Sequence, residues 1–163
     1  MIKFSIVVLA ALLAPVSASA ANFNVPEDKP LASVIVPDSW SPNSYDGGVE
    51  GTSKDGSTYV AFEVVEAKDV ETATKEALET FIKGGVEIDF KSAVQKDTKL
   101  NGIDAFEIAY TGTEKGKATH VSVTLALVDP THFLFVSYWG TPDGEKANMD
   151  DLIKIEASIK IVK

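Results

Sequence analysis

The segment Thr119–Trp139, with the sequence THVSVTLALVDPTHFLFVSYW, constrains the fold more than any other part of the chain. Two runs rich in β-branched and aromatic residues flank a break at Asp129-Pro130-Thr131, and this pattern predicts a β-hairpin with its turn at the break. The first run alternates large apolar residues with the small residues Ser122, Thr124 and Ala126. The second run is apolar on both faces, which is typical of a central strand covered on both sides. We therefore expect this hairpin at the centre of a sheet, with a helix able to approach its small-residue face closely.

The first twenty residues have the features of a secretory signal peptide. Lys3 supplies a positive charge, Phe4–Leu13 is an apolar run, and Ala18-Ser19-Ala20 fits the small-x-small pattern of signal peptidase sites. The apolar run is too short to cross a bilayer, which takes about 20 residues. We expect cleavage after Ala20 and export to the periplasm or the medium. The remaining residues, 21–163, have the length of one domain.

The composition narrows the range of partners. The chain has no cysteine, so it forms no disulfide and offers no cysteine for lipid attachment. After cleavage, 14 lysines and no arginine stand against 24 acidic residues, a formal net charge of −10. Such a chain should repel nucleic acid and anionic lipid, and without arginine a site for anionic substrates is not expected. We expect no membrane insertion after cleavage.

The first half of the mature chain predicts strands followed by a helix. A strand is expected at Leu31–Val36 and a loop at Ser41–Gly48. The turn at Lys54-Asp55-Gly56-Ser57 predicts a hairpin whose second strand is Thr58–Val65. Helical spacing of apolar residues predicts a helix over Asp69–Lys83, with Asp69 as its N-cap and Gly84-Gly85 as its end.

The second half predicts two further hairpins and a second helix. Asn101-Gly102 is a primed-type turn between Lys91–Leu100 and Ile103–Thr111, and Gly112–Gly116 is a turn that leads into the central hairpin. The segment Val86–Phe90 fits either a strand or an irregular connection. A last helix starts at Thr141-Pro142 and presents Met149, Leu152, Ile153 and Ile155 on its apolar side. The segment Ile159–Val162 is a candidate for a short edge strand.

This order of elements predicts the fold class. Strands joined by tight turns are antiparallel, and two amphipathic helices are available to cover the sheet. We therefore expect an α+β fold in which an antiparallel sheet of about six strands is flanked by two main helices.

Catalytic and metal-binding patterns are missing. If the central turn is at Asp129–Thr131, His120 and His132 lie about 25 Å apart at opposite ends of the hairpin, at about 3.4 Å per residue. They cannot share one centre, and without cysteine a zinc or copper site is not expected. The sequence also lacks nucleophile motifs of the Gly-x-Ser-x-Gly kind. We therefore expect neither an enzyme nor a cofactor.

Four aromatic residues remain as candidate site residues. They are Trp40, Tyr45, Tyr138 and Trp139. Amphipathic rings of this kind build pockets and partner surfaces. The alternative is that both tryptophans plug the ends of the core, as large aromatic side chains usually do.

Three short segments resemble a known family. Val34-Ile-Val-Pro-Asp-Ser-Trp40 joins an apolar strand to a Pro-x-x-Trp step, Lys99–Phe106 has a strand, a small turn with glycine and a strand, and Ser158-Ile159-Lys160 ends the last helix. In these features the mature chain resembles the PsbP-like superfamily, whose bacterial exported members include the DcrB-like group. The resemblance implies a PsbP-like α/β/α sandwich and a binding or assembly role. It matches no metal or partner site of that superfamily.

Three hypotheses on function follow. The favoured one is an exported, soluble accessory or binding protein that is not an enzyme and binds a protein partner in the cell envelope. The alternative is a periplasmic small-molecule carrier with an apolar pocket near Trp40 and Trp139. The third is a hydrolase that uses scattered carboxylates, which would need a cleft carboxyl group of strongly raised pKa. The ligand or partner and the oligomeric state stay open.

Overall fold

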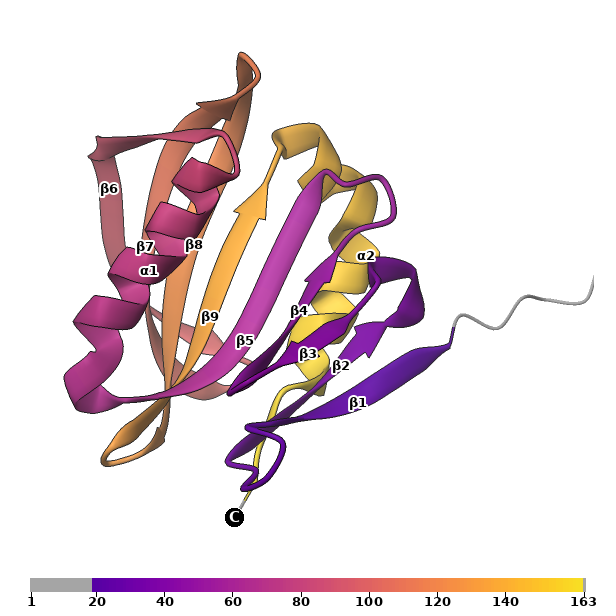
Figure 1. Cartoon of the computed structure of the whole chain (residues 1–163), viewed down its shortest axis with the longest axis vertical. Coiled ribbons are helices and arrows are strands. Elements are labelled where there is room, and N and C mark those ends of the chain that lie inside the picture. The colour runs from indigo at the N-terminus through magenta and orange to yellow at the C-terminus, as the bar shows by residue number, and fades with distance from the viewer. Residues whose placement is uncertain (1–18, 163) are drawn as a thin grey trace, which may run out of the picture.

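The computed structural model describes residues 19–162 (Figure 1). Residues 1–18 of the expected signal peptide therefore lie outside the described residues. Within residues 19–162, none of the helices is both long and apolar enough to cross a membrane.

The larger of two antiparallel sheets has seven strands, in the order β3-β4-β5-β9-β8-β7-β6. The strands are β3 (Asn43–Tyr45), β4 (Gly48–Thr52), β5 (Thr58–Glu66), β6 (Val86–Leu100), β7 (Ile103–Glu114), β8 (Lys117–Asp129) and β9 (His132–Gly140). The predicted central hairpin is β8–β9, in which Val121 pairs with Trp139 and Asp129 with His132. Strand β9 also pairs with β5 on its other side. The hairpin is therefore central, as its sequence predicts.

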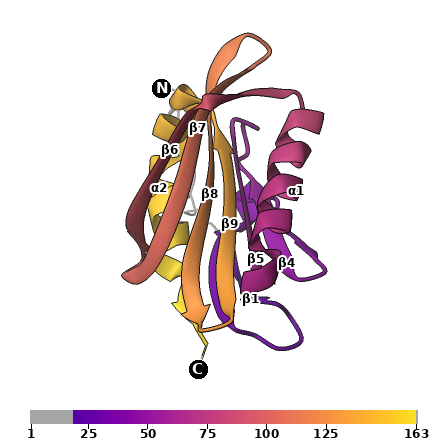
Figure 2. The same cartoon turned by 90° about the vertical axis from the view of Figure 1, so that its left-hand side faces the viewer.

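The smaller sheet has the order β1-β2-β10, with β1 (Ala20–Val25), β2 (Ala32–Pro37) and β10 (Lys160–Ile161). Figure 2 shows helix α1 (Val70–Lys83) on one face of the large sheet and α2 (Pro142–Ser158) on the other. The small sheet lies on the α2 side, because β2 and α2 pack in one hydrophobic cluster. Two 3-10 turns, Asp38–Trp40 and Ala67–Asp69, complete the described elements. The fold is α+β, as expected.

The large sheet separates two hydrophobic cores. On the α2 side, Val36 of β2, Phe62 of β5 and Ile155 of α2 belong to one buried cluster. Ala126, from the small-residue face of β8, lies in the same cluster, which confirms that this face accommodates a helix layer. On the α1 side, Leu78 packs in a second cluster with residues of β8 and β9.

The structure has more strands than the expected six, and two of the additional ones, β1 and β3, lie in segments where no strand was expected. The expected loop Ser41–Gly48 contains β3 and the start of β4, joined by a tight turn in which Gly47 has φ +91°. Asn43 of β3 donates to Glu50 of β4 across the pair, at 3.2 Å. No strand was expected at β1, although Ala21, Phe23 and Val25 alternate with asparagines and are more buried than those asparagines. Strand β3 is exposed throughout, so it carries no apolar alternation.

The helix ends differ in part from expectation. Asp69 is not a side-chain cap, since the 3-10 turn Ala67–Asp69 runs directly into α1. The predicted stop is confirmed: Gly85 has φ +98°, and the N–H of Gly84 donates to Thr80 O at 2.9 Å. In α2, Met149 and Ile153 were expected on the apolar side, but they are 47% and 56% exposed. They face solvent because Ile155 takes the core position.

The turns occur at the glycine-containing segments where the sequence predicts them. Asn101 and Gly102 have φ +48° and +83°, as a type I′ turn requires. The turn expected over Gly112–Gly116 is narrower, because β7 continues to Glu114 and only Lys115 and Gly116 have positive φ. Val86–Phe90 belongs to β6, so this segment is a strand and not an irregular connection.

The N-terminus of α2 is fixed in place by two contacts. Thr141 Oγ1 accepts a hydrogen bond from Gly144 N at 3.1 Å, and Thr141 N donates to Ser57 O at 3.0 Å. Gly144 packs directly on Ser57, where a Cβ atom would come within 2.6 Å of the Ser57 Cβ. The helix is therefore both capped and held against the β4–β5 turn.

Replacing Thr141 by alanine should lower the free energy of unfolding by about 1 kcal/mol, because one N–H at the start of α2 loses its acceptor. Urea unfolding monitored by circular dichroism measures this loss. Thr141→Ser keeps the hydroxyl and is the matched control. Equal stabilities of the alanine and serine variants would contradict the role of the cap.

Candidate functional site

Trp40 fills the core. It lies in the 3-10 turn after β2, is 1% exposed, and packs in the cluster on the α2 side. Its indole Nε1 donates to Asp151 Oδ2 of α2 at 3.2 Å. For this residue the structural interpretation is correct, because the ring and its polar atom are both satisfied inside the protein.

Tyr138 and Trp139 are neighbours on β9, so their side chains point to opposite faces of the sheet. Trp139 is 9% exposed and lies in the cluster beneath α1. Tyr138 lies on the α2 side, where it packs against the first cluster. Trp40 and Trp139 are therefore on different faces, and the single pocket expected near both does not form.

Tyr138 belongs to a cavity on the α2 side that holds one of the histidines. His120 Nδ1 lies 2.9 Å from Glu145 Oε2, and the Tyr138 hydroxyl donates to Glu145 Oε1 at 3.2 Å. Gly140 makes this cluster possible, because a methyl group there would clash with the Tyr138 hydroxyl and lie 3.3 Å from Glu145 Cγ. The cavity has about 320 Å³. The sequence did not indicate Glu145, because it comes from the following helix.

The two histidines are separated as predicted. His120 pairs with Gly140 at one end of the central hairpin, and His132 pairs with Asp129 at the other. His132 is part of its turn, where Asp129 Oδ1 accepts from the N–H groups of Thr131 and His132 at 2.8 and 2.9 Å. In the described part of the chain, no three His, Asp or Glu side chains gather closely enough to hold a metal ion.

Tyr45 lies in a hollow between α1 and the β3–β5 edge of the sheet. We call it the acid–tyrosine hollow; its polar walls are Tyr45 of β3, Glu50 of β4, Tyr59 and Glu63 of β5, and Glu76 of α1. Its volume is about 270 Å³. Tyr59 donates to Glu50 Oε2 at 2.6 Å, and its ring packs edge-on against Phe81 of α1. The sequence did not predict that these carboxylates lie close together, because they belong to three separate elements.

Burial shifts the ionisation of this hollow. It raises the pKa of Tyr45 and of Tyr59 above the ordinary value of 10.0, and nearby carboxylates add to the effect. Burial also raises the pKa of Glu63 above 4.5, since a partly buried carboxylate loses hydration. The carboxylate-hydrolase hypothesis required a cleft carboxyl group of strongly raised pKa; the pKa of Glu63 is raised by burial, but not by the large shift that the hypothesis needs.

An open apolar groove lies on the other side of α1, toward β6–β8. It has about 620 Å³ and is lined by Val70, Glu71, Thr74, Lys75, Leu78, Glu79 and Ile82 of α1 and by Phe90, Phe106, Ile108 and Leu125 of the sheet. Ile82 and Phe90 are 45% and 55% exposed. We call this site the apolar groove. The sequence did not predict this groove, because spacing along a helix does not reveal where the helix sits on the sheet.

Comparison with solved structures defines the class of fold. The chain has a PsbP-like fold: it matches the cyanobacterial PsbP protein (CyanoP) of Synechocystis with a TM-score of 0.56 and 11% sequence identity. The match covers 89% of this chain and 94% of that chain. This confirms the resemblance drawn from the sequence, at the level of fold.

Two further structures were compared. A protein of Bacteroides thetaiotaomicron matches with a TM-score of 0.52 and 14% identity, over 82% of this chain and 46% of that chain. LpqN of Mycobacterium tuberculosis, a protein involved in cell envelope biogenesis, matches with a TM-score of 0.49 and 16% identity, over 90% of this chain and 86% of that chain. No protein-family profile matches the chain, and no curated protein matches it in sequence.

Three of the four tyrosines should stay neutral in the folded protein at about pH 11, where an unfolded chain ionises them all. Burial raises the pKa of Tyr45, Tyr59 and Tyr138, and an adjacent glutamate adds to the rise at each. The tyrosinate absorbance near 295 nm should therefore stay below half of the value in urea. A full signal with an intact circular dichroism spectrum would contradict this burial.

Proposed function

We propose that this protein is an exported accessory module that is not an enzyme and binds a protein partner of the cell envelope through the apolar groove. Export rests on the expected signal peptide at residues 1–20. The observation that carries the binding role is the groove itself, because apolar side chains that a helix leaves uncovered favour contact with another apolar surface.

The groove has two apolar walls that face each other. Ile82 stands on α1 and Phe90 on β6, and both side chains are about half exposed. Leu78, Phe106 and Leu125 also line the groove, and we take them as its floor. Apolar side chains of a partner could enter between the walls and bury all five residues, in the manner of anchor residues at protein interfaces.

The openness of the groove favours a protein partner over a small-molecule carrier. Sites for small ligands enclose about 70–90% of the ligand surface. Here the two walls remain exposed, so a small ligand would keep much of its surface in water. A protein partner covers the rim as well as the floor.

Charges at the rim fit a partner of mixed polarity. Glu71, Lys75 and Glu79 stand along the exposed side of α1 beside the groove. Lys75 lies 3.8 Å from Glu79, and both side chains are largely solvated. A polar rim around an apolar centre is the usual arrangement of transient interfaces.

The test places a photo-crosslinking residue at position 82 and, as a matched control, at Ile153, an exposed isoleucine on α2. We expect a discrete protein adduct from position 82 in envelope fractions and none from position 153. Phe90→Ser should weaken the adduct about tenfold, since an apolar anchor contributes about 1–3 kcal/mol.

Two outcomes would overturn the proposal. Equal adducts from positions 82 and 153 would show that crosslinking is nonspecific and that the groove is not a binding site. A small apolar molecule that co-purifies with the protein and is lost in the Phe90→Ser variant would favour the carrier function. Circular dichroism of each variant verifies the fold, which these exposed positions should leave intact.

A further inference from the structure

The side of α1 that borders the apolar groove has two parallel stripes of side chains. One stripe consists of Val70, Thr74, Leu78 and Ile82, and the other, which we call the rim stripe, of Glu71, Lys75 and Glu79. Residues four apart on a helix are neighbours along its axis, so both stripes follow the length of α1. The helix has 14 residues, so the groove beside it extends for about 20 Å at 1.5 Å per residue.

Among the residues that the structure describes, the sheet beneath the groove presents no free strand edge. Phe106 and Ile108 belong to β7, which pairs with β6 on one side and β8 on the other. Leu125 belongs to β8, which pairs with β7 and β9. The N–H and C=O groups of both strands therefore bond within the sheet. An extended segment lying on this face would bury its own backbone groups without partners, which is costly.

An α-helix meets this constraint, because its backbone groups bond within the helix. There is room for one: α1 with its side chains covers about 10 Å of a sheet about 30 Å wide, and the flank toward β6 is open. Packed helices lie about 8–10 Å apart, so a second helix beside α1 would contact both walls of the groove.

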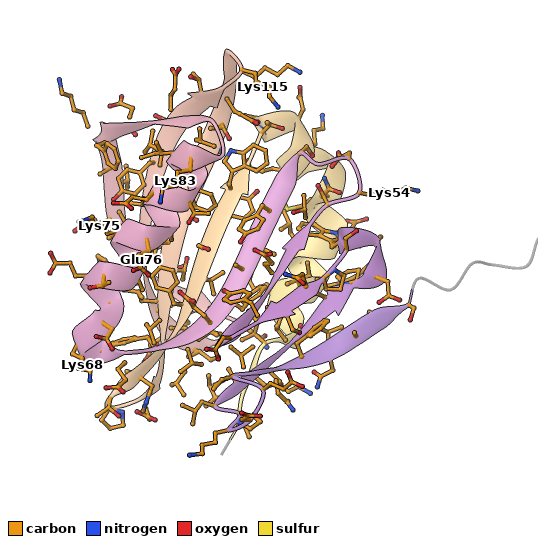
Figure 3. All side chains as sticks on the ribbon, in the orientation of Figure 1. Lys54, Lys68, Lys75, Glu76, Lys83 and Lys115 are labelled. Atoms are coloured by element: carbon orange, nitrogen blue, oxygen red, sulfur yellow. The ribbon has the colours of Figure 1, made fainter. Side chains whose placement is uncertain are left out.

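The charges of the rim stripe alternate, since Glu71, Lys75 and Glu79 follow at intervals of four residues. In Figure 3, Lys75 projects from the side of α1 that faces away from β5. The Glu79 carboxylate lies 3.8 Å from the ammonium groups of both Lys75 and Lys83. Within residues 19–162, Glu71 forms no ion pair. A complementary occupant therefore carries both signs of charge, with a cation opposite Glu71.

We propose that the part of the partner that enters the apolar groove is an amphipathic α-helix lying along α1; this inference rests on the proposed function. Its apolar face, with residues at i, i+3 or i+4 and i+7, packs between Ile82 and Phe90. A flanking stripe of positive, negative and positive residues, each four apart, lies opposite Glu71, Lys75 and Glu79.

Other occupants match less of this surface. An acyl chain fills apolar space but has no charges for the rim stripe. In a two-fold dimer whose α1 helices filled each other's grooves, the sheets would lie on opposite sides of the helix pair and the two helices would run parallel. The rim stripes would then place like charges side by side, which is unfavourable.

The first experiment places photo-crosslinking residues at positions 70, 74 and 82, which leaves the charges of the rim stripe intact. Positions 74 and 82 lie about 6 and 18 Å along α1 from position 70. Mass spectrometry of the adducts from envelope fractions locates each attachment point on the partner. On a helix, the second and third points should lie about 4 and 12 residues from the first, and on an extended segment about 2 and 5.

The second experiment reverses the rim stripe with the combined substitutions Glu71→Lys, Lys75→Glu and Glu79→Lys. A synthetic peptide of the crosslinked segment should bind this variant about tenfold more weakly than the unaltered protein, since three attractive pairs become repulsive. A peptide with its own charges reversed should show the opposite preference.

Asp150→Lys on α2 is the matched control, because it changes the net charge by the same amount on the other face of the sheet. It should leave the affinity for both peptides within about twofold. Circular dichroism verifies that each variant folds.

The outcomes separate this inference from the proposed function. Attachment points about 2 and 5 residues from the first would overturn the helix and leave a protein partner in the groove. Equal binding of the peptide by the unaltered and the reversed proteins would overturn the charge match. Attachment to a lipid or to a second copy of this chain, or no adduct from any of the three positions, would overturn the inference and the proposed function together.

Discussion

The structure depends on burial of both faces of β9. Leu134 and Val136 pack on the α2 side, while Phe135 and Trp139 pack on the α1 side. At about 25 cal/mol for each Å² of apolar surface removed from water, such a strand contributes to two cores at once. Both neighbouring strands, β5 and β8, then pair along nearly its whole length. A polar substitution on either face of β9 would therefore weaken a core and the centre of the sheet together.

The two sites next to α1 exist because the large sheet is wider than the single helix that covers this face. Seven strands at about 4.8 Å spacing make a sheet about 30 Å wide, whereas one helix with its side chains covers about 10 Å. On the opposite face, α2 and the β1-β2-β10 sheet together cover the core. On this face α1 is alone, so an open region remains on each flank. The flank toward β6–β8 is apolar, and the flank toward β3–β5 is acidic and phenolic.

The sequence predicts the elements better than the sites. The central hairpin, the Asn101-Gly102 turn and the start of the last helix at Thr141-Pro142 are local signals, and each is confirmed. Strand β3 was missed because its three residues are all exposed and carry no period of two. Strand β1 was missed although Ala21, Phe23 and Val25 do alternate with asparagines. Among the four aromatic residues, strand alternation already implies that Tyr138 and Trp139 face opposite sides. The place of Trp40 depends on its contact with Asp151, which lies 111 residues away and leaves no local signal.

The carboxylates show why the acid–tyrosine hollow could not be found from the sequence, and why it matters. Glu50, Glu63 and Glu76 each look like solvated surface residues, and only the pairing of β4 with β5 and the position of α1 bring them together. The pKa of Glu63 is raised by burial above its unfolded value of 4.5, so ionising it costs folding stability as the pH rises through that range. Above that range the charge on Glu63 therefore opposes the stability of the fold. Proteins retain such features mainly where binding or catalysis uses them.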